Sequence, residues 1–463
     1  MEHIVTSIRF AADQRENVYY LLDSDIKELT EAKSSFSLNL YDIVRSKSSL
    51  GDVLSDVDFS AASSKEKEKY LLAVKNSARN LSKNTPFYQN EEVNELTMKM
   101  LPKLRDSSIF FLSKFMLGAP IIFRFHNDSD GAVGAYSIFK SLFLKGFSKF
   151  RDRTAWRMQR GVIYTLEDAS TDILFANNFS SVVKPLLVII DFGTLTESNP
   201  GISLANEKFD ILWLDHHPIS SGFEGTKLEH YINPWLFGGD SDYTAGLLAC
   251  TFSKIYSNIE TSEIEEASLV GDYSRFVNDN KKGKEISELL ELVTSDTRII
   301  NSKDLSPYEI DEILSNEEKR IELLSYARLH MNEALDAALQ AVKVYKSEKS
   351  NLYLLDFENV RSDDMRYPLP GRFASKLLSK IEALSDKPCI VVLHFSTFIS
   401  LRASKSLDID LIEVAKSAKA SFKYVDSAGG HRSAVSIKLK DENSKKAVIS
   451  FVIQKLGFTT HMA

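Results

Sequence analysis

The stretch FDILWLDHHP, residues 209–218, ends a run of apolar residues with one aspartate and two histidines. Titratable side chains directly after an apolar run are typical of the carboxyl end of a buried strand, where loops leave the core of a parallel sheet. A pair of neighbouring histidines is by itself more often structural than ligand-binding. The interpretation of this stretch therefore depends on what the rest of the chain brings to the same edge.

Other short apolar runs precede this stretch, and each ends in polar residues. They lie at 119–131, 161–168 and 184–193, with segments of helical spacing such as 131–147 between them. Buried strands that alternate with helices indicate an α/β fold with a parallel sheet. We therefore expect the polar ends of several strands to meet at one edge of the sheet.

Four segments supply candidate metal ligands to that edge, the last of them after a further short apolar run. Their side chains are His126, Asp128, Asp130, Asp191, Asp215, His216, His217 and Asp272. Two divalent cations roughly 3.5–4 Å apart need several carboxylates, at least one of them bridging, to offset their mutual repulsion. Carboxylates mixed with imidazoles suit manganese, with magnesium as the second choice, better than a zinc site that lacks thiolates.

Each of these residues also has a structural explanation. Aspartates at strand ends often cap the next helix, and for Asp128 or Asp191 alone this explanation is as good as metal binding. Asp128 and Asp130 alternate, so an extended segment would point both to one side, and Gly131 would let the chain turn tightly into the next helix. The set of four segments favours metal binding, because buried carboxylates without a partner are costly.

The composition is that of a globular protein with more than one domain. The chain has 463 residues, of which 43% are hydrophobic and 26% charged, so two or three domains are expected. The net charge of −7 gives no sign of overall nucleic-acid affinity, and it leaves a local basic groove open.

Nothing in the sequence indicates a membrane or secretory protein. No apolar run approaches the roughly 20 residues of a membrane span, and the N-terminus lacks the pattern of a secretory signal. Cys250 and Cys389 are the only cysteines. Two cysteines far apart argue against a disulfide framework and favour a reducing, cytoplasmic setting.

The texture of the sequence divides the chain into four regions. Residues 1–115 have a mostly helical and polar pattern, with a serine-rich helix start at 63–81. Residues 116–316 contain the alternating strands and helices. A long helical connector is expected over 317–349, and residues 350–463 alternate again, as in a smaller α/β domain.

Four motifs in the larger α/β region resemble those of the DHH phosphoesterase superfamily. In order along the chain they are HNDSDG (126–131), VIIDFG (188–193), LDHH (214–217) and LVGD (269–272). Further on, SLRAS (400–404) and AGGH (428–431) resemble the strand and the glycine-rich signature of the DHH-associated domain. The two-domain layout and HNDSDG look most similar to archaeal RecJ-like exonucleases, the GINS-associated nuclease branch, which is akin to the eukaryotic replication factor of the CMG helicase.

The resemblance implies a phosphodiesterase with two divalent cations, Mn²⁺ or Mg²⁺, whose catalytic domain is 116–316 and whose substrate-binding domain is 350–463. The metal ligands that it implies are His126, Asp128, Asp130, Asp191, His216 and Asp272. Asp191 would bridge the cations, while His217 and Asp215 would touch phosphate or orient their neighbours. The substrate-binding residues that it implies are Arg402, Ser404, Gly429, Gly430, His431 and Arg432. The implied activity is the release of nucleotides from single-stranded DNA or RNA in DNA replication or repair.

Two departures and two alternatives accompany this resemblance. Arg124 stands where some branches have a metal-binding histidine, and Ala428 replaces the first glycine of the signature. A non-catalytic replisome scaffold that binds GINS or helicase subunits is one alternative function; an oligoribonuclease or cyclic-dinucleotide phosphodiesterase is the other. The basic and aromatic segment 140–160 fits either a single-strand-binding surface or an amphipathic helix with its aromatic side chains in the core.

Overall fold

The computed structural model describes residues 2–10, 17–26, 29–34, 37–46, 50, 52–55, 57–145, 150–302, 305–360 and 366–459. The chain divides into two compact units. The first comprises Met1–Leu290 and Ser302–Ser315, and the second comprises Glu291–Asn301 and Asn316–Ala463.

A five-stranded sheet forms the centre of the first unit, with the strand order β11-β10-β9-β6-β7. Every neighbouring pair is parallel. The strands are β6 (Ile121–His126), β7 (Thr154–Gln159), β9 (Leu186–Ile190), β10 (Asp210–Leu214) and β11 (His230–Ile232). The predicted α/β fold with a parallel sheet is confirmed.

The strand expected over 161–168 is wrong. The strand of this region is β7, which ends at Gln159, and α4 (Leu166–Ala176) begins within the expected range. β7 lies at the edge of the sheet, and its four central residues are only partly buried. An edge strand needs no continuous apolar run, so β7 lacks the pattern that marks the other strands.

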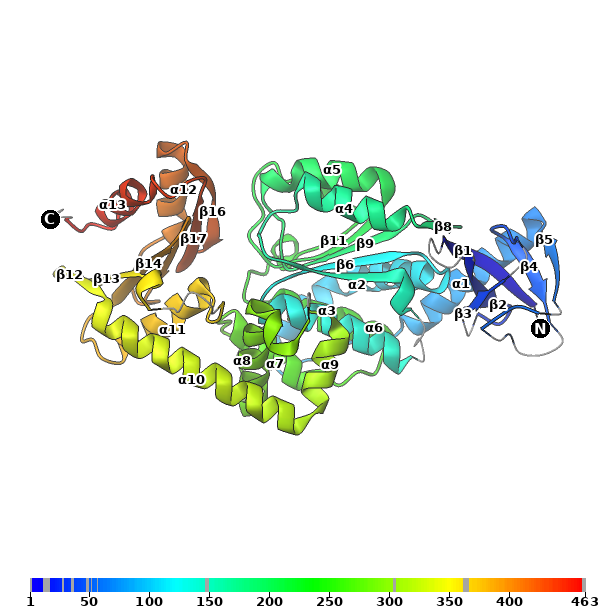
Figure 1. Cartoon of the computed structure of the whole chain (residues 1–463), viewed down its shortest axis with the longest axis horizontal. Coiled ribbons are helices and arrows are strands. Elements are labelled where there is room, and N and C mark those ends of the chain that lie inside the picture. The colour runs from blue at the N-terminus through cyan, green and yellow to red at the C-terminus, as the bar shows by residue number, and fades with distance from the viewer. Residues whose placement is uncertain are drawn as a thin grey trace. The chain divides into compact units, whose positions relative to one another are not determined.

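Helices cover both faces of the parallel sheet (Figure 1). α4 and α5 (Asn199–Lys208) lie on one face, where Trp213 of β10 and Leu187 of β9 share an apolar core with Ala169 and Ile202. On the other face lie α2 (Glu91–Met116), α3 (Ser129–Leu144), α6 (Ala245–Tyr256) and α7 (Ser262–Gly271). Since all the strands are parallel, their carboxyl ends share one edge between these two layers.

The N-terminal region is a sheet followed by helices, so the prediction of a mostly helical region over 1–115 is wrong for its first half. The strands are β1 (Glu2–Phe10), β2 (Asn17–Asp23), β3 (Leu29–Lys33), β4 (Asp42–Arg45) and β5 (Asp58–Ala61), in the order β3-β2-β1-β4-β5. β8 (Phe179–Ser181) from the middle of the unit pairs with β1. Six consecutive residues of β1 are buried, so the strand shows no alternation of apolar and polar residues.

The second half of that region is helical, as predicted. α1 (Ser64–Leu81) begins with a capping box in which Ser63 and Glu66 bond each other's backbone N–H. This reciprocal pair satisfies two N–H groups that the first turn of a helix leaves without partners. α2 follows and packs against α1.

The second unit contains a smaller six-stranded sheet, which confirms the predicted second α/β domain. The order is β12-β13-β14-β15-β17-β16, and only β13 and β14 are parallel. The strands are β12 (Lys343–Lys346), β13 (Asn351–Asp356), β14 (Cys389–Phe395), β15 (Phe398–Ala403), β16 (Val425–His431) and β17 (Ala434–Leu439). The helices are α10 (Glu317–Ala341), α11 (Pro370–Glu382), α12 (Leu411–Ser421) and α13 (Lys445–Lys455). The helical connector expected over 317–349 is therefore shorter, because β12 begins at Lys343.

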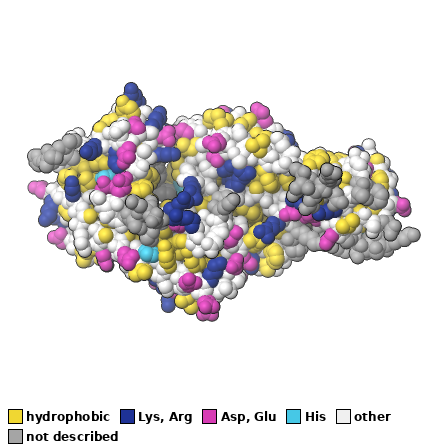
Figure 2. Space-filling view, viewed as in Figure 1, with side chains coloured by type: hydrophobic (Ala, Val, Ile, Leu, Met, Phe, Trp, Pro, Cys, Tyr) yellow, Lys and Arg dark blue, Asp and Glu magenta, His cyan; other side chains and the backbone are white. Residues whose placement is uncertain are grey.

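The remaining α-helices of the described residues are α8 (Lys281–Ser295) and α9 (Pro307–Ser315). Within the residues that the structure describes, no helix is both long enough and apolar enough to cross a membrane. Acidic, basic and apolar side chains are intermixed over the face of the molecule drawn in Figure 2.

Candidate metal centre

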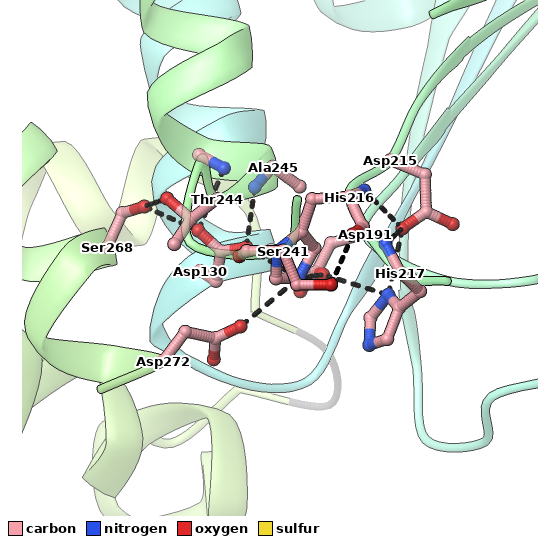
Figure 3. Close-up of polar contacts among 12 residues, drawn as sticks. Asp130, Asp191, Asp215, His216, His217, Ser241, Thr244, Ala245, Ser268 and Asp272 are labelled. Carbon is pink, nitrogen blue, oxygen red and sulfur yellow. Dashed lines mark hydrogen bonds and ion pairs between the residues drawn. The ribbon is translucent and has the colours of Figure 1, made fainter. Parts of the chain in front are cut away.

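The predicted ligands from three strands meet at the carboxyl edge of the parallel sheet. His126 ends β6, Asp191 directly follows β9, and His216 follows β10 by two residues. Asp272 joins them from the C-terminus of α7. The short apolar run before Asp272 is therefore part of a helix and not a strand of the sheet. Figure 3 shows Asp130, Asp191, His216 and Asp272 pointing toward one another from these separate elements.

Two groups of three ligands have no residue in common. In each group the potential ligand atoms lie within 4.8 Å of one another; the groups are His126, Asp128 and Asp191, and Asp130, His216 and Asp272. A third such group overlaps both and joins Asp191 and His216 to His217. Asp191 belongs to the first group and also faces the second. Its Oδ2 lies 3.7 Å from His126 Nδ1 within its own group, and its Oδ1 lies 3.3 Å from His216 Nε2 of the other group. This is the arrangement that a bridging carboxylate requires.

The backbone conformation and the buried carboxylate of Asp191 are both energetically unfavourable. Its backbone has a φ of 69°, in the left-handed region that residues other than glycine rarely adopt. Both carboxylate oxygens are buried and accept no hydrogen bond within the described residues. Burial, with Asp128 and Asp130 nearby, raises the pKa of Asp191 well above its ordinary value. Strain and missing hydrogen bonds at one residue are features of functional sites.

Asp128 caps a helix and belongs to a ligand group at the same time. Its Oδ1 accepts a hydrogen bond of 3.0 Å from the backbone N–H of Gly131, which is the N-cap contact of α3, and its Oδ2 lies 2.8 Å from His126 Nδ1. Gly131 is helical, so the tight turn expected there is wrong. A Cβ at Gly131 would lie 2.5 Å from the carbonyl oxygen of His126, so glycine is required because α3 starts directly against the end of β6.

Asp130 is fully buried and held by the N-terminus of α6. The backbone N–H groups of Ala245 and Gly246 donate to its two oxygens at 2.9 and 2.8 Å, and the Ser268 hydroxyl donates to Oδ1. Helix N-termini favour negative charge, but burial and the neighbouring Asp272 raise the pKa of Asp130 to about 6. A Cβ at Gly246 would lie 2.8 Å from Asp130 Oδ1, so this glycine is needed for the contact.

The orientation of His216 is fixed by a backbone carbonyl. Its Nδ1 donates a hydrogen bond of 2.7 Å to the carbonyl oxygen of Ser241, so Nε2 is the atom that faces the carboxylates, with Asp272 at 3.1 Å. Burial alone would lower the pKa of His216, but contact with Asp191 and Asp272 raises it well above its ordinary value. A histidine whose other ring nitrogen is bonded to a carbonyl is the usual form of a metal ligand.

Asp215 lies behind the two histidines and orients the second. Its Oδ1 accepts hydrogen bonds from the backbone N–H groups of His216 and His217 and lies 2.8 Å from His217 Nδ1. Burial would raise the pKa of Asp215, but His217 beside it holds that pKa below its usual value. Since the ionised carboxylate only accepts, Nδ1 of His217 is the donor, and its Nε2 lies on the opposite side of the ring.

Arg124, which stands at the position of a histidine in some DHH branches, has a structural role. It is 4% exposed, and its guanidinium contacts Asp168 at 2.9 Å and Asp172 at 2.7 Å, both on α4. It also donates to Gln159 of β7 at 2.8 Å. This network joins β6 and β7 to α4, on the face of the sheet that α4 covers.

The segment 140–160 is not the single amphipathic helix that the structural alternative expected, because α3 ends at Leu144 and β7 begins at Thr154. Phe143 is 48% exposed, but the later aromatic side chains pack against the protein. Phe150 is 1% exposed, and Trp156 stacks on Phe123 with ring centroids 3.9 Å apart. Arg153 is buried against the Phe115 ring and donates to the carbonyl of Ala119. These side chains pack in the core of the first unit, while residues 146–149, including Lys149, lie outside the described residues.

In the second unit, the predicted substrate-binding side chains mostly bind the protein itself. Arg402 donates to Ser375 Oγ at 2.8 Å, Ser400 Oγ at 2.9 Å and the carbonyl of Gly371 at 3.1 Å. Ser404 is 3% exposed, and its hydroxyl bonds both backbone groups of Cys389. We therefore assign Ser404 a structural role instead of the substrate contact implied by the motif.

The glycine-rich signature lies in β16, which is an edge strand of the sheet in the second unit. Gly429 and Gly430 lie in β16 and pair with Ser436 and Val435 of β17. Gly430 has a φ of 139°, and a Cβ there would lie 2.3 Å from the carbonyl oxygen of Ala434. Arg432 follows in an exposed turn and pairs with Asp408 at 2.5 Å, whereas the side chain of His431 lies outside the described part of the structure.

Sequence reasoning missed the residues that hold the ligands in place. Thr244 is the N-cap of α6, and Ser268 donates to Asp130. Ser241 accepts from the His216 imidazole through its backbone carbonyl, and its hydroxyl donates to the carbonyl of His216 at 2.8 Å. The one signal in the sequence was TAG at 244–246. A threonine before a helical run is a typical helix start, and the glycine leaves room for another chain segment to approach the first turn. A carbonyl contact has no signature in the sequence, because every residue has that group.

Comparison with known proteins identifies the fold. No protein-family model matches this chain. An uncharacterized protein of Methanocaldococcus jannaschii is 30% identical over 228 aligned residues, which cover 46% of this chain and 29% of that protein. The chain thus spans less than a third of the length of that relative.

This chain is similar to several solved structures. One, described as the DHH domain of a member of a family of ribosomal proteins, aligns with a TM-score of 0.70 at 20% identity, over 85% of this chain and 98% of that chain. RecJ of Thermus thermophilus in complex with Mn²⁺ aligns with a TM-score of 0.49 at 13% identity, over 84% of this chain and 59% of that chain. The first likeness shows that this chain has the fold of a DHH-domain protein.

Proposed function

We propose that the protein is a metal-dependent phosphodiesterase that releases nucleotides from the ends of single-stranded DNA or RNA. The observation that carries this proposal is the pair of ligand groups that Asp191 faces on both sides. A set of four aspartates and two histidines on one edge of a DHH-type fold suits phosphoryl chemistry with two cations.

The donor set fits two divalent cations of the Mn²⁺ or Mg²⁺ type. Its members are carboxylates and imidazoles, which are suitable ligands for these ions, and it contains no thiolate. Asp191 offers two buried oxygens that lack hydrogen bonds in the described residues, so a cation on each side would satisfy both. When bound, the cations would supply Lewis acidity toward the phosphodiester and the attacking water.

His217 would act on the substrate side of the ligands, and Asp215 would hold it in place from behind. Asp215 holds the proton of His217 on Nδ1 and fixes the plane of the ring. An imidazole positioned in this way can touch a phosphate oxygen through Nε2 and stabilise developing negative charge once it is protonated. Its position next to His216 in the chain keeps that contact close to the ligand groups.

The second unit would bind the strand end, mainly through the backbone near Gly429 and Gly430 and through His431 and Arg432. Arg402 would support this edge by joining β15 to α11, since its guanidinium already bonds Ser375 and Gly371. The boundaries 116–316 for the catalytic region and 350–463 for the substrate-binding region belong to the same proposal. The full ligand set favours an enzyme over a non-catalytic scaffold, which has no need for buried carboxylates.

Hydrolysis assays test this function. Chelator-treated protein is incubated with end-labelled single-stranded DNA or RNA and Mn²⁺, Mg²⁺ or no metal. We expect a ladder of shortened products that requires metal, is lost in Asp191→Ala and remains in Asp210→Ala. Asp210 is a matched control, because it begins β10 at the opposite edge of the sheet and pairs with Lys114. Absence of metal-dependent cleavage of both polymers would exclude the exonuclease, and cleavage of dinucleotides or cyclic dinucleotides alone would select the small-substrate alternative.

Within this function, we propose the archaeal RecJ-like branch as the functional relative, with a role in DNA replication or repair and GINS as a partner. The motif HNDSDG and the two-unit layout support this placement. Size-exclusion chromatography of the chain mixed with an archaeal GINS complex tests it. Co-elution is expected, and separate elution of the two would remove GINS from the proposal.

A further inference from the structure

An exposed tryptophan is fixed directly to the ligand-bearing segments. Trp235 belongs to η4 (Pro234–Phe237) and is 44% exposed. Its indole Nε1 donates to the carbonyl oxygen of His216 at 3.1 Å and to Ser241 Oγ at 3.2 Å. These are the two residues whose mutual contact orients the His216 imidazole. The polar edge of the indole is therefore anchored at the metal centre, while much of the ring stays open to solvent.

The turn that carries Trp235 is itself anchored to the same segment. Asn233 Oδ1 accepts a hydrogen bond of 3.0 Å from the backbone N–H of Trp235, and Asn233 Nδ2 donates to the carbonyl of His217 at 3.0 Å. Asn233 is fully buried. The position of the indole is thus set before any ligand binds, which lowers the entropy lost on binding.

A second exposed aromatic side chain belongs to the segment of Asp272. Tyr273 follows Asp272 directly, is 41% exposed and has a φ of 54°. The next residue, Ser274, donates to the carbonyl of Asp242 at 2.7 Å, beside Ser241. The segments of Trp235 and Tyr273 are therefore joined through one loop, the loop that also orients His216.

A nucleotide needs two kinds of contact that this arrangement combines. Its phosphate requires positive charge or cations, and its base stacks on aromatic faces, with little dependence on base identity. The open face of the Trp235 indole offers such a stacking surface beside the ligand groups. A substrate without a base, such as pyrophosphate or polyphosphate, would make no use of this ring.

We propose that Trp235, with Tyr273 as a second aromatic wall, stacks on a base of the nucleotide whose phosphodiester lies at the metal centre. This inference rests on the proposed phosphodiesterase function and names the substrate class: an unpaired nucleotide strand with bases at its end. It assigns recognition of the base to the first unit, with little preference among the bases.

The experiment compares two strands and three proteins. The strands are a single-stranded oligonucleotide and the same oligonucleotide with abasic sites in place of its terminal nucleotides. The proteins are the wild type, Trp235→Phe and Trp235→Leu, and kcat/KM is measured with Mn²⁺. Both variants lose the Nε1 hydrogen bonds, and only Trp235→Phe keeps an aromatic face, so the difference between them isolates stacking. Leu236→Ala is the control, since Leu236 is the next residue and is 50% exposed.

We expect Trp235→Leu to lower kcat/KM on the base-bearing strand roughly 5- to 100-fold more than Trp235→Phe does, whereas the two variants should cleave the abasic strand equally. Trp235→Phe should keep most of the preference for the base-bearing strand, and Leu236→Ala should keep all of it. Equal cleavage of both strands by the wild type, or equal losses in the Phe and Leu variants, would overturn the stacking role alone. A wild type that cleaves neither strand would instead reject the phosphodiesterase function and this inference with it. The wild-type comparison needs no variant, so it decides the question even if a substitution prevents folding.

Discussion

The metal centre of the first unit and the glycine-rich edge of the second unit satisfy their polar groups in different ways. At the metal centre, Asp191 is buried with two oxygens that accept no hydrogen bond in the described residues, and its backbone is strained. In the second unit, Arg402 bonds Ser375, Ser400 and Gly371. Among the described residues, Asp191 thus lacks the hydrogen bonds that Arg402 already has within its own unit.

This difference separates a site that requires a ligand from a site that tolerates one. A buried carboxylate without a partner destabilises the fold unless a cation or a proton arrives. Burial and neighbouring carboxylates raise the pKa values of Asp130 and Asp191, and contact with Asp191 and Asp272 raises that of His216, so protons supply the positive charge that cations would bring. Arg402 in the second unit already has partners and gains less from a ligand.

The largest expected effect comes from removing the charge of Asp191. Asp191→Asn should lower turnover by more than roughly 10³-fold, because both cations lose a shared ligand. In chelator, however, the variant should have a higher Tm than the wild type, because a neutral amide needs neither a proton nor a cation in this buried position and asparagine tolerates a positive φ. Thermal melts with and without Mn²⁺ measure both effects, and Asp210→Asn should change neither. A lower Tm of Asp191→Asn in chelator would refute the idea that this site is incomplete without cations.

The second unit should respond in the opposite way to loss of its arginine. Arg402→Ala should lower the free energy of unfolding by about 2–3 kcal/mol, because hydrogen bonds from a charged donor are lost and Ser375 and the carbonyl of Gly371 lose their partner. The Mn²⁺ content should stay unchanged, and cleavage of long strands should weaken. Urea unfolding and metal analysis measure these effects, with Arg402→Lys as the charge-conserving comparison. An unchanged unfolding midpoint would mean that the Arg402 contacts add no stability.

A smaller effect is expected from Asp215, which contacts the ligands without belonging to any of their groups. Asp215→Asn should reduce turnover about 10- to 100-fold, the usual range for residues that orient metal ligands. The bound Mn²⁺ should remain, because His126, Asp130 and Asp272 are untouched. Steady-state kinetics with metal analysis of the same sample tests this. Loss of Mn²⁺ in the variant would place Asp215 among the ligands.

The smallest effect is a pH dependence in the metal-free protein. The pKa of Asp130 is raised from 3.8 to about 6 in the folded state, so the folded state holds a proton that the unfolded state has lost. The stabilisation from Asp130 is complete below pH 3.8 and disappears as the pH rises through about 6. Tm measured in chelator from pH 4 to 7 should therefore fall more steeply for the wild type than for Asp130→Asn. Parallel curves for the two proteins would contradict this assignment.

Much of the first unit is predictable because its strands are buried on both faces. The runs around β9 and β10 are continuous and apolar, the run of β6 is interrupted only by Arg124, and polar residues directly follow each of them. The same reasoning fails for β1, whose buried run lies in a region with a polar, helical pattern, and for β7, whose polar residues hide an edge strand. Both errors arise because local periodicity reports burial and not pairing.

The sequence by itself determined the parallel α/β fold and which residue types gather at one edge of its sheet. Parallel direction follows from strands that alternate with helices, and parallel strands must end on the same side, whereas the strand order came from the structure. Only the tertiary structure decided how the acids are held: the N–H groups of Ala245 and Gly246 on Asp130, the Ser241 carbonyl on His216, and the indole of Trp235 beside them. These contacts use backbone groups that every residue has, so packing alone selects which of them meet.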